Sequence, residues 1–210
     1  MALEIKENES LSKYSTFKIG GPAKYFVVAT NTEEAKEAID FAKQKSLPFF
    51  VLGGGSNVLF SDSGYSGLVI KLSGVSCAVS GISITAGAGT PLALAVNKSV
   101  EAGLSGLEWA MGIPGTIGGA VAGNAGAYGH SASESVKSVT ILNESGEVIK
   151  INRGGCEFGY RTSKFKKPGN KEIILEVELE LQNGNAEDGK NKIKEILEMR
   201  RSKVPTQPSA

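Results

Sequence analysis

Apolar residues in the first third of the chain recur with the spacing of a helix flanked by strands. One helix face is marked at three- and four-residue intervals by Ala35, Ala38, Ile39 and Ala42. Asn31 precedes this face as a helix N-cap, and Glu34 follows Asn31 by three residues, as in a capping box. Short apolar runs predict strands at 23–29, 49–52 and 69–72, the second of them buried. Together these elements predict a βαβ-type unit that follows an N-terminal loop.

From about residue 75 the pattern changes to many short strands with two further helices. Strands are predicted at 82–86, 137–142, 147–151 and 173–181. In the last of these, apolar residues alternate with glutamates, which is typical of a strand with one face in water. Thr90 and Pro91 predict the N-cap and the first position of a helix that ends at Gly103. A final helix is predicted at 190–203.

These patterns predict an α+β protein of two lobes, residues 1–72 and 73–203, followed by a linker at 204–210. The formal net charge of +1 gives no electrostatic reason to expect a nucleic acid or an anionic membrane as a partner. No apolar run approaches the length of a membrane span, and the polar N-terminus lacks the apolar segment of a signal peptide. Cys77 and Cys156 form no paired motif, so we expect reduced thiols in a cytoplasmic protein.

Glycine is the unusual component of this sequence, with 27 of 210 residues, about 13% against a typical level of about 7%. Much of the excess lies in two segments, of which the first is LGGGSNVL at 52–59. It lacks the Lys-Ser/Thr of a P-loop and the spaced glycines of the dinucleotide fingerprint. The consecutive amides of Gly54, Gly55, Ser56 and Asn57 predict a nest for an anion. We expect a side chain at Gly54 to obstruct that anion, although a tight turn without a ligand would use the same glycines.

The second glycine segment, GIPGTIGGAVAGNAGAYG at 112–129, predicts a short helix over 117–122 capped by Thr116. Glycines in the first turn of this helix would leave its N-terminus open to phosphate or carbonyl oxygens. The alternative is close helix packing, because Gly115, Gly119 and Gly123 have GxxxG spacing. One ligand touching both segments explains both, and the diphosphate of a dinucleotide cofactor lying between the lobes fits best.

Reactive side chains are scarce in this chain. His130 is the single histidine and is expected in a loop without a catalytic role, and no residues form a metal-ligand set. A cofactor would therefore carry the chemistry, which favours hydride transfer over hydrolysis. Arg161 could bind a carboxylate through two hydrogen bonds or stabilise a developing oxyanion. Lys164, Lys166 and Lys167 form a basic cluster that could attract diphosphates, although a solvated charged loop would look the same.

Several motifs together carry a family resemblance over essentially the whole chain. These are TFKIGGPA at 16–23, the two glycine segments, YRTSKF at 160–165 and MRRSKVPTQPSA at 199–210. The chain resembles the UDP-N-acetylenolpyruvoylglucosamine reductases, also called UDP-N-acetylmuramate dehydrogenases, which are flavin enzymes of peptidoglycan synthesis. The resemblance implies the two-lobed FAD-binding fold of the vanillyl-alcohol-oxidase type. It also implies non-covalent FAD, reduction by NADPH, and UDP-N-acetylglucosamine enolpyruvate as the substrate that receives hydride.

The family's site residues map onto this sequence as follows. Arg161 would be catalytic, stabilising the enolate-like intermediate, and Tyr160, Arg161 and Lys164 would bind substrate. FAD would contact the two glycine segments at Gly53, Gly54, Gly55, Ser56, Asn57, Val58, Ile113, Pro114, Gly115, Thr116, Gly118, Gly119, Ala120, Gly123, Asn124 and Gly126.

The family continues beyond the Pro-Ser-Ala of 208–210 with a proton-donating serine and a third, substrate-binding domain. We therefore expect this chain to be the FAD-binding portion, unable to complete the reaction alone, and we do not assign Ser209 to the proton-donor role. Two alternatives stay open: a non-catalytic FAD-binding module, and an oxidase of the wider flavin superfamily. Many such oxidases attach FAD through His or Cys, and neither residue occurs in 52–59.

Overall fold

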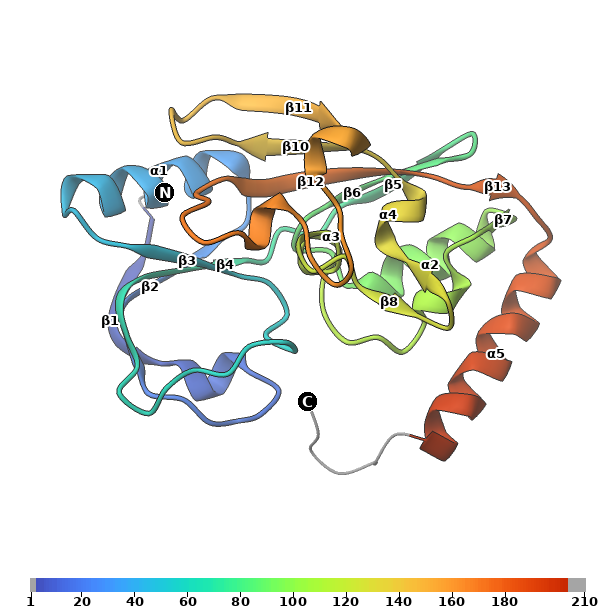
Figure 1. Cartoon of the computed structure of the whole chain (residues 1–210), viewed down its shortest axis with the longest axis horizontal. Helices are drawn as coiled ribbons and strands as arrows, with labels where there is room; N and C mark the ends of the chain where they lie inside the picture. The colour runs from blue at the N-terminus through green and yellow to red at the C-terminus, as the bar shows by residue number, and fades with distance from the viewer. Residues whose placement is uncertain (1–2, 204–210) are drawn as a thin grey trace.

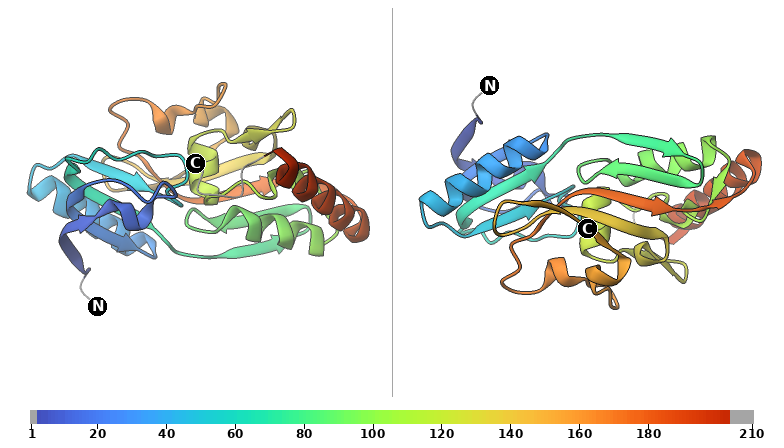
Figure 2. Two further views of the ribbon diagram at one scale, coloured as in Figure 1. Left: turned by 90° about the horizontal axis from the view of Figure 1, so that it is seen from below. Right: turned by 90° about the horizontal axis from the view of Figure 1, so that it is seen from above.

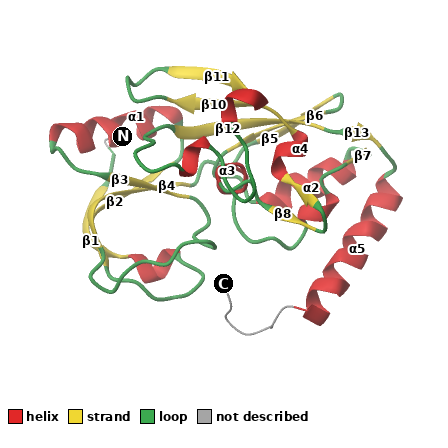
Figure 3. Cartoon of the chain, viewed as in Figure 1, coloured by secondary structure: helices red, strands yellow, loops and turns green. Residues whose placement is uncertain are grey.

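The computed structural model describes residues 3–203, which form two large β-sheets and two two-stranded ones, with helices packed against the large sheets (Figures 1 and 3). The large sheets lie side by side along the long axis of the molecule, and Figure 2 shows α5 at the end opposite to α1. The chain leaves the first sheet at Leu72 and enters the second at Cys77. The predicted linker at 204–210 lies outside the described residues. No helix between residues 3 and 203 is both long enough and apolar enough to cross a bilayer.

The first sheet has the order β1-β2-β4-β3, with β2 and β3 both parallel to β4. Its elements are β1 (Ile5–Ser10), β2 (Pro22–Ala29), α1 (Thr32–Gln44), β3 (Phe49–Leu52) and β4 (Tyr65–Leu72). The four apolar residues of the predicted helix face are all buried in α1. The βαβ-type unit is therefore confirmed. Only Leu52 of β3 is buried, because β3 is an edge strand rather than the buried strand predicted.

Two local predictions in this sheet were incomplete. The Asn31 side chain accepts from the Glu34 amide, but the Glu34 carboxylate accepts from the Thr30 amide at 2.6 Å instead of returning to Asn31. The region predicted as an N-terminal loop contains β1 and a 3-10 helix, η1 (Leu11–Tyr14). β1 reads IKENES and has no apolar pattern, since it is an edge strand whose order comes from antiparallel pairing with β2.

The second sheet has the order β11-β10-β12-β6-β5, and all its pairings are antiparallel. Its strands are β5 (Cys77–Ser80), β6 (Ser83–Gly87), β10 (Val136–Leu142), β11 (Val148–Asn152) and β12 (Ile173–Glu180). Small elements complete this lobe: β7 (Leu104–Ser105), η2 (Glu108–Ala110), β8 (Gly126–Ala127), β9 (His130–Ser131), α4 (Ala132–Ser135), η3 (Arg153–Cys156), η4 (Lys164–Lys166) and β13 (Gln182–Asn183). The predicted hairpin between β10 and β11 is confirmed, whereas β5 was not predicted.

Three helices cover this lobe: α2 (Leu92–Glu101), α3 (Ile117–Ala122) and α5 (Ala186–Lys203). The N-cap of α2 is Pro91, not Thr90 as predicted. The Thr90 hydroxyl instead donates to the Ser76 carbonyl at 2.7 Å and accepts from the Ser76 amide. Gly103 ends α2 as predicted, with a φ of +70° that favours glycine.

Buried side chains form three clusters, and one of them holds the first glycine loop against its sheet. One cluster joins α1 and the first sheet to Leu142 and Ile173 of the second sheet, so the two sheets share a core. Another lies on the opposite face of the first sheet and contains Leu11, Leu52 and Phe60. Leu52 and Phe60 bracket the first glycine segment, so their burial holds both ends of that loop against the sheet.

Candidate cofactor site at the first glycine loop

The first glycine loop follows β3 and leaves a series of main-chain donors without protein acceptors. Within residues 3–203, the amides from Gly54 to Leu59 make no hydrogen bond to any main-chain or side-chain acceptor. Gly55 is buried and has a φ of +69°, the left-handed conformation that a nest requires. The Lys71 ammonium donates to the Gly53 carbonyl at 3.0 Å, and burial lowers the pKa of Lys71. The loop therefore has the donor set of an anion site.

The two glycine loops, about sixty residues apart in sequence, touch through their main chains. A Cβ added to Gly54 would lie 2.7 Å from Gly115 Cα, and one added to Gly53 would lie 2.6 Å from Thr116 Oγ1. The Ser56 hydroxyl also donates to the Pro114 carbonyl at 2.9 Å. The sequence predicted one ligand touching both loops, and the structure shows in addition that the loops contact each other directly. The expectation for Gly54 was wrong in direction, because a side chain there would point at the second loop rather than into an anion path.

The first turn of α3 differs from the prediction. Thr116 caps this helix by accepting from the Gly119 amide at 3.4 Å, as expected. However, the amides of Ile117 and Gly118 donate to the carbonyls of Thr90 and Ala88, each at 2.9 Å. The N-terminus of α3 is thus closed by the connection between β6 and α2. Gly118 permits this approach, because an added Cβ would lie 2.7 Å from the Ala88 Cβ.

The hydroxyl of Thr16 belongs to this site and was not predicted as a site residue. Thr16 Oγ1 is buried and has no hydrogen-bond partner among the described residues. The Thr16 amide donates to the Gly55 carbonyl at 3.0 Å, so this hydroxyl lies beside the loop with unpaired amides. A buried hydroxyl without a partner costs about 1–3 kcal/mol, which favours a ligand at this point. The TFKIGGPA motif was a signal for this region, but nothing in it singled out Thr16.

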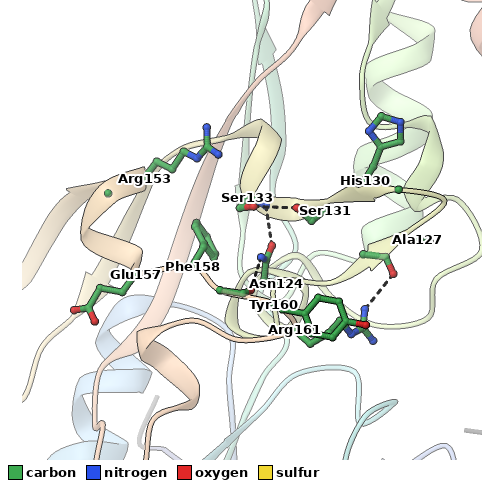
Figure 4. A pocket seen from close by; sticks show the side chains of 14 residues that line it. Asn124, Ala127, His130, Ser131, Ser133, Arg153, Glu157, Phe158, Tyr160 and Arg161 are labelled. Carbon is green, nitrogen blue, oxygen red and sulfur yellow. Dashed lines mark hydrogen bonds between the residues drawn. The ribbon is translucent and has the colours of Figure 1, made fainter.

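A second feature is an open cavity of about 1060 Å³ next to the Tyr160–Arg161 turn (Figure 4). Asn124, Gly126, Tyr160 and Arg161 line it, whereas Gly53–Val58 and 113–120 do not. Tyr160 is 96% exposed. The Arg161 guanidinium donates through Nη1 to the Gly126 carbonyl at 3.1 Å, and the other donors of this exposed group find no acceptor among residues 3–203. The predicted residues are therefore divided between an anion site and a cavity with an available guanidinium.

The structure pairs most of the predicted basic cluster with carboxylates. Lys164, whose side chain is 16% exposed, lies 2.8 Å from a Glu172 oxygen and is absent from the cavity lining. Lys167 forms an ion pair with Glu157, which lowers the pKa of that carboxyl. Lys164 is thus engaged inside the protein rather than presented to a substrate. The basic cluster is for the most part internally neutralised.

His130 lines the cavity but belongs to the two-residue strand β9 rather than to a loop. Its Nδ1 lies 2.9 Å from a Glu134 oxygen, and this hydrogen bond lowers the pKa of Glu134. Glu134 also accepts from the Ser131 amide and so completes the cap of α4. Between residues 3 and 203, no group of three or more His, Cys, Asp or Glu side chains could hold a metal ion.

Comparisons with known proteins match this chain to FAD-binding proteins. Residues 23–152 match a family model described as an FAD binding domain. UDP-N-acetylenolpyruvoylglucosamine reductase of Lachnoclostridium phytofermentans is 40% identical over 210 residues, which cover 97% of this chain and 67% of that protein. The chain therefore spans about two thirds of the length of such curated relatives.

Solved structures extend the comparison. The crystal structure of UDP-N-acetylenolpyruvylglucosamine reductase from Thermus caldophilus matches with a TM-score of 0.83 and 33% identity, covering 100% of this chain and 73% of that one. 6-Hydroxy-D-nicotine oxidase from Arthrobacter nicotinovorans matches with a TM-score of 0.64 and 18% identity, covering 87% of this chain and 43% of that one, which shows the fold alone. These matches confirm the predicted fold class and give no support to the oxidase alternative.

Proposed function

Because the chain belongs to the UDP-N-acetylenolpyruvoylglucosamine reductase family, we propose that it holds FAD along its first glycine loop for the reduction of UDP-N-acetylglucosamine enolpyruvate by NADPH. When bound, FAD supplies the hydride chemistry that the chain's own side chains lack. The peptidoglycan-precursor product and a cytoplasmic location belong to the same proposal. The chain would provide the flavin-binding part of this activity.

The observation that carries this proposal is the run of amides from Gly54 to Leu59 that have no acceptor among the described residues. Consecutive main-chain N–H groups in a nest bind anions, and a diphosphate offers several oxygens to such a row. The buried Thr16 hydroxyl adds a further unpaired donor at the same loop. The residues that would hold the cofactor are therefore those of the first loop, supported from behind by Gly115 and Thr116.

Arg161 has a separate role in this proposal. Its hydrogen bond to Gly126 leaves further guanidinium donors without an acceptor among the described residues, and a carboxylate is the natural partner of that planar group. The enolpyruvyl group carries a carboxylate, and the carbon bonded to this carboxylate becomes electron-rich during reduction. Arg161 would bind this carboxylate and stabilise the developing negative charge.

The test is a titration of the purified chain with FAD, followed through the flavin absorbance and fluorescence. If the amides hold the diphosphate, ADP will compete with FAD, whereas riboflavin, which lacks phosphate, will not. Anaerobic addition of NADPH should then bleach the bound flavin. Absence of FAD binding, or competition by riboflavin but not by ADP, would contradict the assignment of the diphosphate to this loop.

A further inference from the structure

We propose that Asn124 is a positioning residue that fixes the Tyr160–Arg161 turn to the end of α3, rather than a ligand of the cofactor. This inference rests on the proposed function, because it concerns how Arg161 is held where it would meet substrate. It also removes Asn124 from the predicted FAD contacts. Figure 4 shows Asn124 between the Ser131–Ser133 segment and the turn that carries Arg161.

The main chain of Asn124 first ends α3. The Asn124 amide donates to the Val121 carbonyl at 3.1 Å, and the Ala125 amide donates to the Ala120 carbonyl at 2.7 Å. These two bonds form a Schellman motif, in which the residue after the helix adopts a left-handed conformation. Asn124 has a φ of +41°, a value that asparagine tolerates better than most residues. The side chain is therefore held in a fixed place at the end of the helix.

The side chain of Asn124 then joins two segments that are distant in sequence. Its Nδ2 donates to the Gly159 carbonyl at 2.9 Å, and its Oδ1 accepts from the Ser133 amide at 3.0 Å. Asn124 is only 7% exposed, so loss of either partner would leave a buried polar group unpaired. Both ends of the amide are thus used within the protein.

The turn that receives this bond is strained and short. Gly159 and Thr162 exchange main-chain hydrogen bonds of 3.0 and 3.3 Å, and Arg161 between them has a φ of +57°. A positive φ is unfavourable for arginine, so the surrounding contacts must maintain this conformation. Without them, we expect the turn to relax and Arg161 to leave its present position.

Two other hydrogen bonds join the same segments. The fully buried Ser163 hydroxyl donates to the Ala122 carbonyl at 2.7 Å, and Arg161 donates to the Gly126 carbonyl at 3.1 Å. Residues 122–126 therefore hold the turn at three points, of which Asn124 is the central one. Because Thr116, the N-cap of α3, lies beside the first glycine loop, this arrangement links the proposed cofactor site to Arg161 through one short helix.

Two substitutions separate the roles of Asn124. Asn124→Gly removes both side-chain bonds while keeping a residue suited to positive φ, so the end of α3 is preserved. Asn124→Asp keeps the acceptor for the Ser133 amide but replaces the donor to Gly159 by a carboxylate oxygen. Asn143→Gly, on the β10–β11 hairpin, is the matched control. Hydrogen exchange of the Gly159, Thr162 and Ser133 amides is measured with and without FAD, together with the FAD dissociation constant.

In Asn124→Gly, we expect exchange at Gly159, Thr162 and Ser133 to accelerate at least about tenfold, whereas Asn124→Asp accelerates it at Gly159 and Thr162 only. The dissociation constant of FAD should change less than about threefold in both variants. Addition of UDP-N-acetylglucosamine enolpyruvate to the flavin-loaded variants should give the weakened flavin difference spectrum of Arg161→Ala.

Unchanged exchange at Gly159 and Thr162 in both variants would overturn the proposal. So would a large loss of FAD affinity without a change in exchange, because Asn124 would then be a cofactor ligand. If the unsubstituted chain binds no FAD, the proposed function fails, but exchange in the cofactor-free chain still decides whether Asn124 fixes the turn.

Discussion

Substitution of Gly54 by alanine tests whether the close approach of the two glycine loops is required for the site. The added Cβ would lie 2.7 Å from Gly115 Cα, whereas ordinary contacts of this kind begin at 3.4 Å. Gly54 is not among the residues with positive φ, so the effect of the added methyl is steric rather than conformational. The two nearest atoms, Gly115 Cα and Gly115 C, belong to the main chain, so they cannot move aside by a side-chain rotation.

The loops would have to separate by about 0.7 Å to accommodate this methyl group. The same displacement would lengthen the 2.9 Å bond from Ser56 to Pro114 to about 3.6 Å, beyond hydrogen-bond distance. Overpacking costs about 1–3 kcal/mol and the lost hydrogen bond about 1 kcal/mol. We therefore expect the free energy of unfolding to fall by about 2–4 kcal/mol. FAD affinity should fall at least about tenfold, because the row of amides moves with the loop.

The free energy of unfolding is measured by urea denaturation of the cofactor-free chain, and FAD affinity by fluorescence titration. Gly155→Ala is the control, because its added Cβ would come no closer than 3.4 Å to another atom and it lies in η3, outside both loops. If Gly54→Ala is as stable as Gly155→Ala and binds FAD equally well, the close approach of the loops has no role in the site.

Three further perturbations test other parts of the structure. Gly55→Ala should lower the free energy of unfolding in urea by more than about 3 kcal/mol, because the added Cβ would overlap the Tyr14 carbonyl and because Gly55 has a φ of +69°. A stability equal to that of the unsubstituted chain would contradict the geometry of this loop. Arg161→Ala should leave the FAD dissociation constant within about threefold yet weaken the flavin spectral response to the enolpyruvyl substrate. A normal response would remove Arg161 from the substrate site. Hydrogen bonds from Lys150, Ser138 and Lys137 lower the pKa of Glu178 to about 2. The stability that Glu178 contributes is therefore complete above the ordinary carboxyl pKa of 4.5 and is lost as the pH falls toward 2. Glu178→Gln should reduce this part of the pH dependence in acid denaturation, and an unchanged profile would show that the ion pairs contribute nothing.

The sequence alone determined those elements whose signals are local. The apolar face of α1, the Thr116 cap of α3 and the hairpin between β10 and β11 depend on residues a few positions apart, and all three are confirmed. The two glycine segments indicated that the main chain closely approaches a ligand or another segment of the chain. The family resemblance predicted the fold class and FAD. β1 was missed because an edge strand of polar residues is ordered by its neighbour and carries no periodic pattern of its own.

Only the tertiary structure decided which segment of the chain each glycine approaches. Gly54 and Gly118 look equivalent in sequence as phosphate-binding glycines, but the fold places Gly115 against the first and Ala88 against the second. Thr90 and Asn124 likewise carry side chains whose hydrogen-bonding groups suit a cap or a ligand, yet Ser76 and Gly159 are their partners. A polar group does not encode its partner, because a hydrogen bond depends on which segments folding brings within about 3 Å. The sequence therefore determined which residues could bind, and the packing of the two lobes determined which of them remain available for a ligand.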